Sequence, residues 1–167
     1  MLKRIISFAL VLLTLSWMGV IFSFSCENGG ESAESSGRFI RKIVSVIDGD
    51  FDTLSPEEQT KFIEKYDHFV RKAAHFSIYA VLGGLLYLTA FSLGADKKKG
   101  YVVSVVIGAL YAVSDEVHQY FVPGRACMIR DMLLDSAGVA IGAAVLLGLV
   151  HLIVKKTNRR SAYALCW

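Results

Sequence analysis

The sequence predicts an all-α integral membrane protein with four transmembrane helices. Of its 167 residues, 54% are hydrophobic, and the mean hydropathy is +0.48. Four segments reach the roughly 20 apolar residues that a helix needs to cross a bilayer, at about 5–25, 73–93, 101–122 and 132–154. We therefore expect a single membrane domain over residues 1–167, with one long loop between the first two helices.

Short basic segments predict the orientation of these helices, because lysine and arginine resist translocation across the membrane. Such segments lie at residues 3–4, 97–99 and 155–160, on the same side of a four-helix topology. Both termini are then cytoplasmic in the cell membrane, whereas the loop 26–72 and the short segment 123–131 are extracytoplasmic. As an alternative, the first apolar run is a cleaved signal peptide, although it is long for that role.

The loop between the first two helices predicts two short amphipathic helices after a flexible start. Residues 27–37 are rich in Ser, Gly and Glu and lack periodic apolar positions, which is typical of a loop. Residues 38–47 repeat apolar side chains at helical spacing. Ser55 and Pro56, followed by two glutamates, predict the start of a second helix with an apolar stripe as far as Val70. We expect both helices on the outer membrane surface; the alternative is a lid over the site.

The third predicted helix contains a Ser-Asp-Glu-Val-His-Gln run inside an otherwise apolar segment. An acid or base near the bilayer centre costs about 2.5–3.5 kcal/mol on insertion scales, so such residues usually face a bundle interior and serve a substrate, ion or proton. Residues three and four apart share a helix face, so Tyr111, Asp115, His118 and Gln119 project broadly together. Glu116 is rotated by about 100° from its neighbour Asp115.

Two other helices carry polar side chains that reach the same depth. Lys72, His75 and Tyr79 share a face of the second helix, and Asp131 and Asp135 share a face of the fourth. The second and fourth helices enter the membrane on the side where the third leaves, so the three stripes meet at one level. Each residue alone has a structural explanation, such as an ion pair or an aromatic anchor. Together, two acids, two histidines and several cations at one level predict a site.

Other patterns in the sequence have structural explanations and do not predict a functional site. Gly83 and a GxxxG pattern at Gly138 and Gly142 lie within predicted spans, where small residues allow helices to pack closely. Cys26 and Cys127 fall on the same side of the membrane, and free thiols are favoured there over a disulfide. The chain has no nucleotide-binding glycine loop and no basic aromatic surface suited to nucleic acid.

Several stretches carry a family resemblance: Trp-Met-Gly-Val-Ile-Phe-Ser-Phe-Ser at 17–25, Arg-Lys-Ala-Ala-His-Phe-Ser-Ile-Tyr at 71–79, the run at 114–119, and Pro-Gly-Arg at 123–125 with Asp131 and Asp135. At these residues, and through most of the chain, the sequence resembles the VanZ-like family of small bacterial membrane proteins. It departs from the family pattern near Asp135, where many relatives have an asparagine, and at 126–128. The resemblance implies a multi-pass protein of the bacterial cell envelope, and the family's namesake is associated with resistance to the glycopeptide teicoplanin.

The predicted site suits an enzyme that acts at the outer leaflet on an anionic or lipid-linked envelope substrate. A histidine would carry the proton, oriented by a carboxylate, which makes His75, Asp115, Glu116 and His118 the catalytic candidates. Arginine holds a phosphate or carboxylate through two parallel bonds. The candidates for substrate binding are the cations and polar groups around the catalytic set: Arg71, Lys72, Tyr79, Gln119, Arg125, Asp131 and Asp135.

Three alternatives stay open at this point. His75, Asp115, Glu116 and His118 offer nitrogen and oxygen ligands for zinc or manganese, but their spacing matches no strong metal motif and nearby arginines oppose a cation, so the sequence assigns no metal ligand and no cofactor. A receptor or stabilising subunit would use the same cluster to bind a lipid head group, a glycopeptide or a partner protein. A proton-coupled carrier of four helices would be small unless the protein oligomerises.

Overall fold

The computed structural model describes the backbone of residues 1–47 and 51–164, and side chains as far as Lys156. Within these residues every element is helical and no strand is present, which confirms the predicted all-α class. The elements are α1 (Leu2–Ser25), α2 (Gly29–Ile47), the 3₁₀ turn η1 (Phe51–Thr53), α3 (Pro56–Ser92), α4 (Lys97–Gln119) and α5 (Ile129–Ala164).

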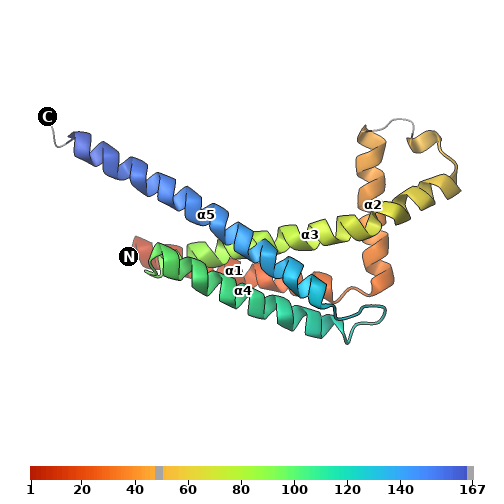
Figure 1. The fold of residues 1–167 in the computed structure, drawn as a ribbon, viewed down its shortest axis with the longest axis horizontal. Helices are drawn as coiled ribbons and strands as arrows, with labels where there is room; N and C mark the ends of the chain where they lie inside the picture. Colours follow the sequence, from red (N-terminus) through yellow and green to blue (C-terminus); the bar gives the residue numbers. More distant parts are fainter. Residues whose placement is uncertain (48–50, 165–167) are drawn as a thin grey trace.

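Four of these helices are long and apolar enough to cross a membrane, as predicted: α1, α3, α4 and the part of α5 from Ile129 to Lys156. Figure 1 shows these four running along the long axis of the molecule, whereas α2 stands across one end of the bundle. The amino terminus lies at the opposite end from α2, where α5 also finishes. The described chain therefore begins and ends on the same side of the bundle.

The expectation of a flexible segment at residues 27–37 was wrong, because α2 already begins at Gly29. Asn28 and Glu31 form a reciprocal cap at its start. The Asn28 side chain accepts a hydrogen bond from the Glu31 backbone N–H (2.9 Å), and the Glu31 carboxylate accepts one from the Asn28 N–H (3.1 Å). Such a box satisfies backbone donors that a helix start leaves unpaired. It therefore stabilises a helix whose composition resembles that of a loop.

The second predicted amphipathic helix is not separate, because it is the first part of α3. Its predicted start is confirmed: Ser55 caps the helix, and Glu58 completes the reciprocal hydrogen bonds. No glycine or proline occurs from Glu57 to Leu82, so nothing in the chain interrupts the helix before it enters the apolar segment. As a result, residues 68–75 belong to one continuous helix and lie at the depth where the polar side chains of α3, α4 and α5 meet.

Close backbone contact between α3 and α5 places the polar faces of these helices against each other. A Cβ atom on Gly142 would overlap the carbonyl oxygen of Ala80, and one on Gly83 would overlap the backbone of Val139. A Cβ atom on Gly138 would lie 2.6 Å from the Phe76 carbonyl oxygen. The predicted role of these glycines in helix packing is confirmed, because only residues without a side chain permit this approach.

Hydrogen bonds tie α1 to the rest of the bundle. The Trp17 indole N–H donates to the Ile78 carbonyl (2.9 Å), and the Tyr111 hydroxyl donates to the Met18 carbonyl (2.7 Å). Both acceptors belong to helical backbone, whose carbonyls have a second lone pair available. These bonds lie beside a small core at the centre of the bundle, formed by Ile21, Tyr79, Leu82, Leu86, Ala112 and Val139.

Candidate functional site

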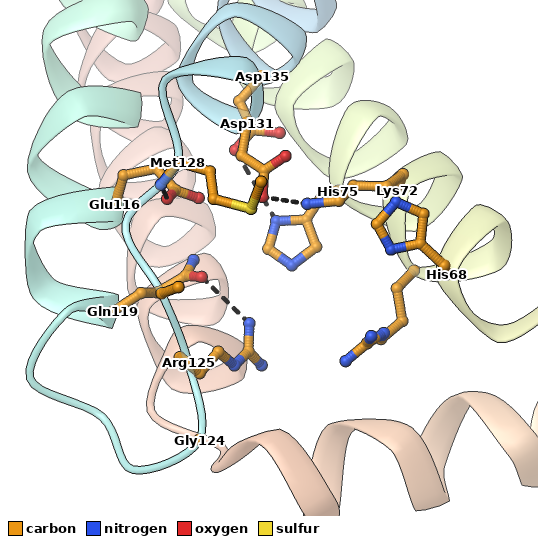
Figure 2. Close-up of a pocket in the computed structure, with 12 residues that line it drawn as sticks. His68, Lys72, His75, Glu116, Gln119, Gly124, Arg125, Met128, Asp131 and Asp135 are labelled. Atoms are coloured by element: carbon orange, nitrogen blue, oxygen red, sulfur yellow. Dashed lines mark hydrogen bonds and ion pairs between the residues drawn. The ribbon is translucent and has the colours of Figure 1, made fainter.

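A polar pocket of about 170 Å³ opens at the end of the bundle where α4 finishes and α5 begins. Figure 2 shows its wall made by side chains from α3, α4, α5 and the loop between α4 and α5. The residues that line it are His68, Arg71, Lys72, His75, Glu116, Gln119, Gly124, Arg125, Ala126, Met128, Asp131 and Asp135. We call it the polar pocket.

The loop from α4 to α5 is shaped so that it covers one side of the polar pocket. Gly124 has a φ of +74°, a left-handed conformation that side chains with a Cβ rarely adopt. The turn brings the loop against the start of α2, where the Gly29 N–H donates to the Pro123 carbonyl (3.2 Å). At its other end, the Met128 N–H donates to the carboxylate of Glu116 (2.9 Å). The loop is therefore fixed at both ends.

Arg125 reaches into the polar pocket from this loop, and its guanidinium is half-buried. It donates to the Glu27 carbonyl (3.1 Å), the Phe24 carbonyl (3.4 Å) and the side-chain oxygen of Gln119 (3.2 Å). All three acceptors are neutral, and no carboxylate lies within ion-pair distance of Arg125 in the described part of the chain. Burial, followed by the like charge of Arg71, lowers the pKa of the Arg125 guanidinium.

The other two cations of the polar pocket have acidic partners. Arg71 pairs with Asp67 one turn earlier on α3 (Nε to Oδ2, 3.2 Å), and Lys72 pairs with Asp131 at the start of α5. Figure 2 shows the second of these pairs bridging α3 and α5 at the rim. Of these three cations, Arg125 is the one without a carboxylate within ion-pair distance among the described residues.

Two buried aspartates and a histidine lie close together, partly in the wall of the polar pocket and partly behind it. Asp135 is fully buried and Asp115 is 3% exposed. His75 Nδ1 lies 3.8 Å from Asp135 Oδ2. Asp115 does not line the polar pocket itself but lies directly behind it, joined to the pocket wall through Gln119, whose side-chain N–H donates to Asp115 Oδ2 (3.1 Å). Arg125, Gln119 and Asp115 therefore form one continuous hydrogen-bonded chain.

Asp115 Oδ2 also accepts a hydrogen bond from the Tyr79 hydroxyl (2.9 Å), across the buried contact of α4 with α3. We expect Tyr79→Phe to lower the free energy of unfolding by about 0.6–1.7 kcal/mol, from the average to the largest value measured for hydrogen bonds between membrane helices. Tyr87→Phe provides the matched control. Tyr87 is equally buried on the same helix, but its hydroxyl has no hydrogen-bond partner within the described residues.

Reversible unfolding in mixed detergent measures both free energies. Tyr87→Phe should be neutral or slightly stabilising, because it removes a buried polar atom that gains nothing from its surroundings. An equal effect of the two substitutions would contradict a specific role of the Tyr79 bond to Asp115.

Most of the side chains predicted from the sequence to form the site come together here. All but Tyr79, Asp115 and His118 line the polar pocket. His118 lies elsewhere. Its ring stacks at 4.6 Å on Phe22 of α1, and its Nε2 lies 3.5 Å from the sulfur of Cys26, which is a free, exposed thiol. The expectation that His118 shares a face with Asp115 is therefore not met. His75 is the nominated histidine that lines the pocket.

Sequence reasoning missed His68 and Met128, which also line the polar pocket. His68 lies seven residues before His75, a spacing of two helical turns that keeps both on one face of α3. That spacing was visible in the sequence, but His68 lay outside the predicted span. Figure 2 shows the Met128 side chain in the pocket, but a single methionine in a loop forms no pattern that could indicate this.

Comparison with known proteins gives one match. No curated protein and no solved structure matched the chain. The family model described as VanZ/LLP1 matches residues 10–153, which include all four candidate membrane helices except the ends of the first and last. The matched segment also contains every residue of the polar pocket. This membrane protein belongs to the VanZ/LLP1 family.

Proposed function

We propose that this protein acts in the bacterial cell envelope by binding the anionic head group of a lipid-linked envelope component in the polar pocket. The observation that carries the proposal is the environment of Arg125. Its guanidinium is half-buried, its partners are neutral, and it lies close enough to Arg71 for the two like charges to interact. A phosphate or carboxylate between the two guanidinium groups would relieve that repulsion and accept bidentate hydrogen bonds.

An apolar groove beside the polar pocket supports a lipid as the carrier of that head group. The groove has a volume of about 550 Å³ and lies between α3 and α5. It shares His68, Lys72, Met128 and Asp131 with the polar pocket and continues along apolar side chains: Phe69, Ala73, Phe76 and Leu134. A hydrocarbon chain lying along this groove would leave its charged end at the pocket.

The proposal includes an orientation and a cellular role. The basic segments at 3–4, 97–99 and 155–160 lie at the end of the bundle away from the polar pocket, which favours cytoplasmic termini and a pocket that opens to the outside. The namesake of the family is associated with resistance to the glycopeptide teicoplanin. We therefore propose that an outward-facing pocket links this protein to teicoplanin tolerance or to envelope lipid and wall metabolism.

Binding is the part of this function that the geometry supports directly. A reaction would require a proton carrier at the bound head group, and His75 is placed for that role, whereas His118 faces α1. A receptor or stabilising subunit would use Arg125 and Arg71 in the same way without chemistry. The two functions differ in whether the bound lipid is altered.

Susceptibility to teicoplanin and vancomycin tests the cellular role. Cells expressing the wild type at membrane levels matched by immunoblot should tolerate more teicoplanin than cells with an empty vector. Arg125→Gln should abolish the gain, whereas Arg38→Gln should retain it, because Arg38 is an exposed arginine of α2 outside the polar pocket that pairs with Glu34 one turn away. An unchanged susceptibility with the wild type would contradict the role in tolerance. Full tolerance with Arg125→Gln would exclude the polar pocket from it.

A further inference from the structure

We propose that His75, Asp115 and Asp135 form a binding site for a divalent transition-metal ion of the zinc or manganese type. The three residues come from α3, α4 and α5, and each offers one ligand atom, with these atoms all within 4.8 Å of one another. His75 and Asp135 line the polar pocket, so an ion can enter from it. The inference goes beyond the proposed binding of a lipid head group and does not depend on it.

Three of the four carboxylate oxygens of this trio accept no hydrogen bond from the described residues. Both oxygens of Asp135 and the Oδ1 atom of Asp115 are buried, and none has a hydrogen-bond partner in the described part of the chain. Taking an ionised carboxylate out of water costs several kcal/mol unless it is paired or coordinates a metal. One carboxylate oxygen of Asp115 and one of Asp135 lie within 4.8 Å of each other and of a ring nitrogen of His75, so a cation placed among these atoms would satisfy them together.

Neighbouring groups hold the ligands in an orientation that suits a metal. Asp115 Oδ2 accepts hydrogen bonds from Tyr79 and Gln119, which fixes the carboxylate and leaves Oδ1 as the free atom. Ligating carboxylates are generally hydrogen-bonded in this way by outer groups. Imidazole nitrogen with carboxylate oxygen is a donor set that zinc and manganese accept.

The distances are close to those of a coordinated ion. Ligands at about 2.0–2.2 Å from a tetrahedral zinc ion lie roughly 3.3–3.6 Å from one another. His75 Nδ1 and Asp135 Oδ2 are 3.8 Å apart, slightly longer than such a separation. The largest separation in the trio is bounded by 4.8 Å, so coordination requires side-chain shifts of about one ångström or less.

The charges around the trio favour a cation, contrary to the expectation from the sequence that the arginines oppose one. Lys72 is paired with Asp131 and Arg71 with Asp67. Among the described residues that line the polar pocket or lie buried directly behind it, the remaining charged groups are the carboxylates of Asp115, Glu116 and Asp135 and the guanidinium of Arg125. These buried acids exceed the available positive charge, and a divalent ion would offset the excess.

Equilibrium dialysis with metal analysis tests the site on the purified full chain in detergent, after chelation and without added lipid. Zn²⁺ and Mn²⁺ are offered separately. We expect one ion per chain for at least one of them, and a melting temperature that rises with the concentration of that ion. Asp135→Asn should weaken binding by more than about 100-fold, beyond the 10–100-fold typical of outer groups. Glu34→Gln, which neutralises an exposed acid of α2 outside the polar pocket, should change it by less than about fivefold.

The folded state of each variant is checked by its elution as a monodisperse species and by its melting temperature without metal. Asp135→Asn removes a buried charge that accepts no hydrogen bond, so its metal-free form should melt no lower than that of the wild type. His75→Ala provides a second variant that removes a ligand without adding a polar group. Absence of metal binding by the wild type would overturn the proposal. So would a metal affinity of Asp135→Asn and His75→Ala that equals that of the wild type. Because no lipid is present, neither result depends on head-group binding.

Discussion

Gly142→Val is expected to prevent the bundle from assembling. A Cβ atom at this position would overlap the carbonyl oxygen of Ala80, and the adjacent Cα of Ala80 lies within 2.9 Å of it. The obstacle is backbone rather than a side chain that could rotate away, so α3 and α5 would have to separate. Overpacking of a well-packed core costs about 1–3 kcal/mol, and a clash with backbone should exceed the upper end of this range.

The yield of monodisperse protein after detergent extraction, and its unfolding in mixed detergent, measure this effect. Gly148→Val is the matched control, because Gly148 lies on the same helix but nothing lies within 4 Å of a Cβ placed there. It makes the same chemical change at an open position. A Gly142→Val protein with wild-type yield and unfolding would contradict the close contact of α3 and α5, and with it the position of Asp135.

Arg125→Gln is expected to remove the binding of an anionic lipid head group almost completely. Loss of one partner of a buried, hydrogen-bonded charge pair costs about 2–5 kcal/mol, or an affinity loss of about 30-fold or more. Arg125→Lys should recover part of it, because lysine keeps the charge but not the planar fork that holds a phosphate through two bonds. The measurement is a titration of each variant in nanodiscs with a polyprenyl phosphate.

Arg125 also donates to the carbonyls of Glu27 and Phe24, so its loss could weaken the loop as well as the site. The melting temperature of Arg125→Gln separates the two effects. Arg38→Gln removes one arginine from the same end of the molecule without touching the polar pocket, and should bind like the wild type. Equal weakening by both substitutions would mean that the lipid responds to overall charge rather than to Arg125.

The membrane helices could be predicted from the sequence because length and hydropathy alone define them. The region before α3 could not. A helix such as α2, with serines and glycines in its first turns, depends on a cap at Asn28 and Glu31 and on packing against α3. The continuity of α3 was also missed, because the change from a polar to an apolar face suggests a boundary that no glycine or proline enforces.

The rotation of α4 explains why the site was predicted only in part. At about 100° per residue, Gln119 falls between Asp115 and Glu116 on the helical wheel, and His118 falls beyond Asp115 on the other side. Asp115, Glu116 and Gln119 are all buried, so the inward face is centred near Gln119. Grouping residues by spacing alone centred it on Asp115 and included His118. The position of α1, which contacts His118 through Phe22, is tertiary information that spacing does not contain.

Titration of the wild-type protein in nanodiscs with a polyprenyl phosphate and with the corresponding neutral polyprenol tests the central claim most directly. The two probes share the hydrocarbon chain and differ in the charged group that Arg125 and Arg71 are proposed to bind. We expect saturable binding of the phosphate and an affinity for the alcohol that is lower by about 30-fold or more. Equal affinities would show that the chain alone is recognised, and would contradict a head-group site in the polar pocket.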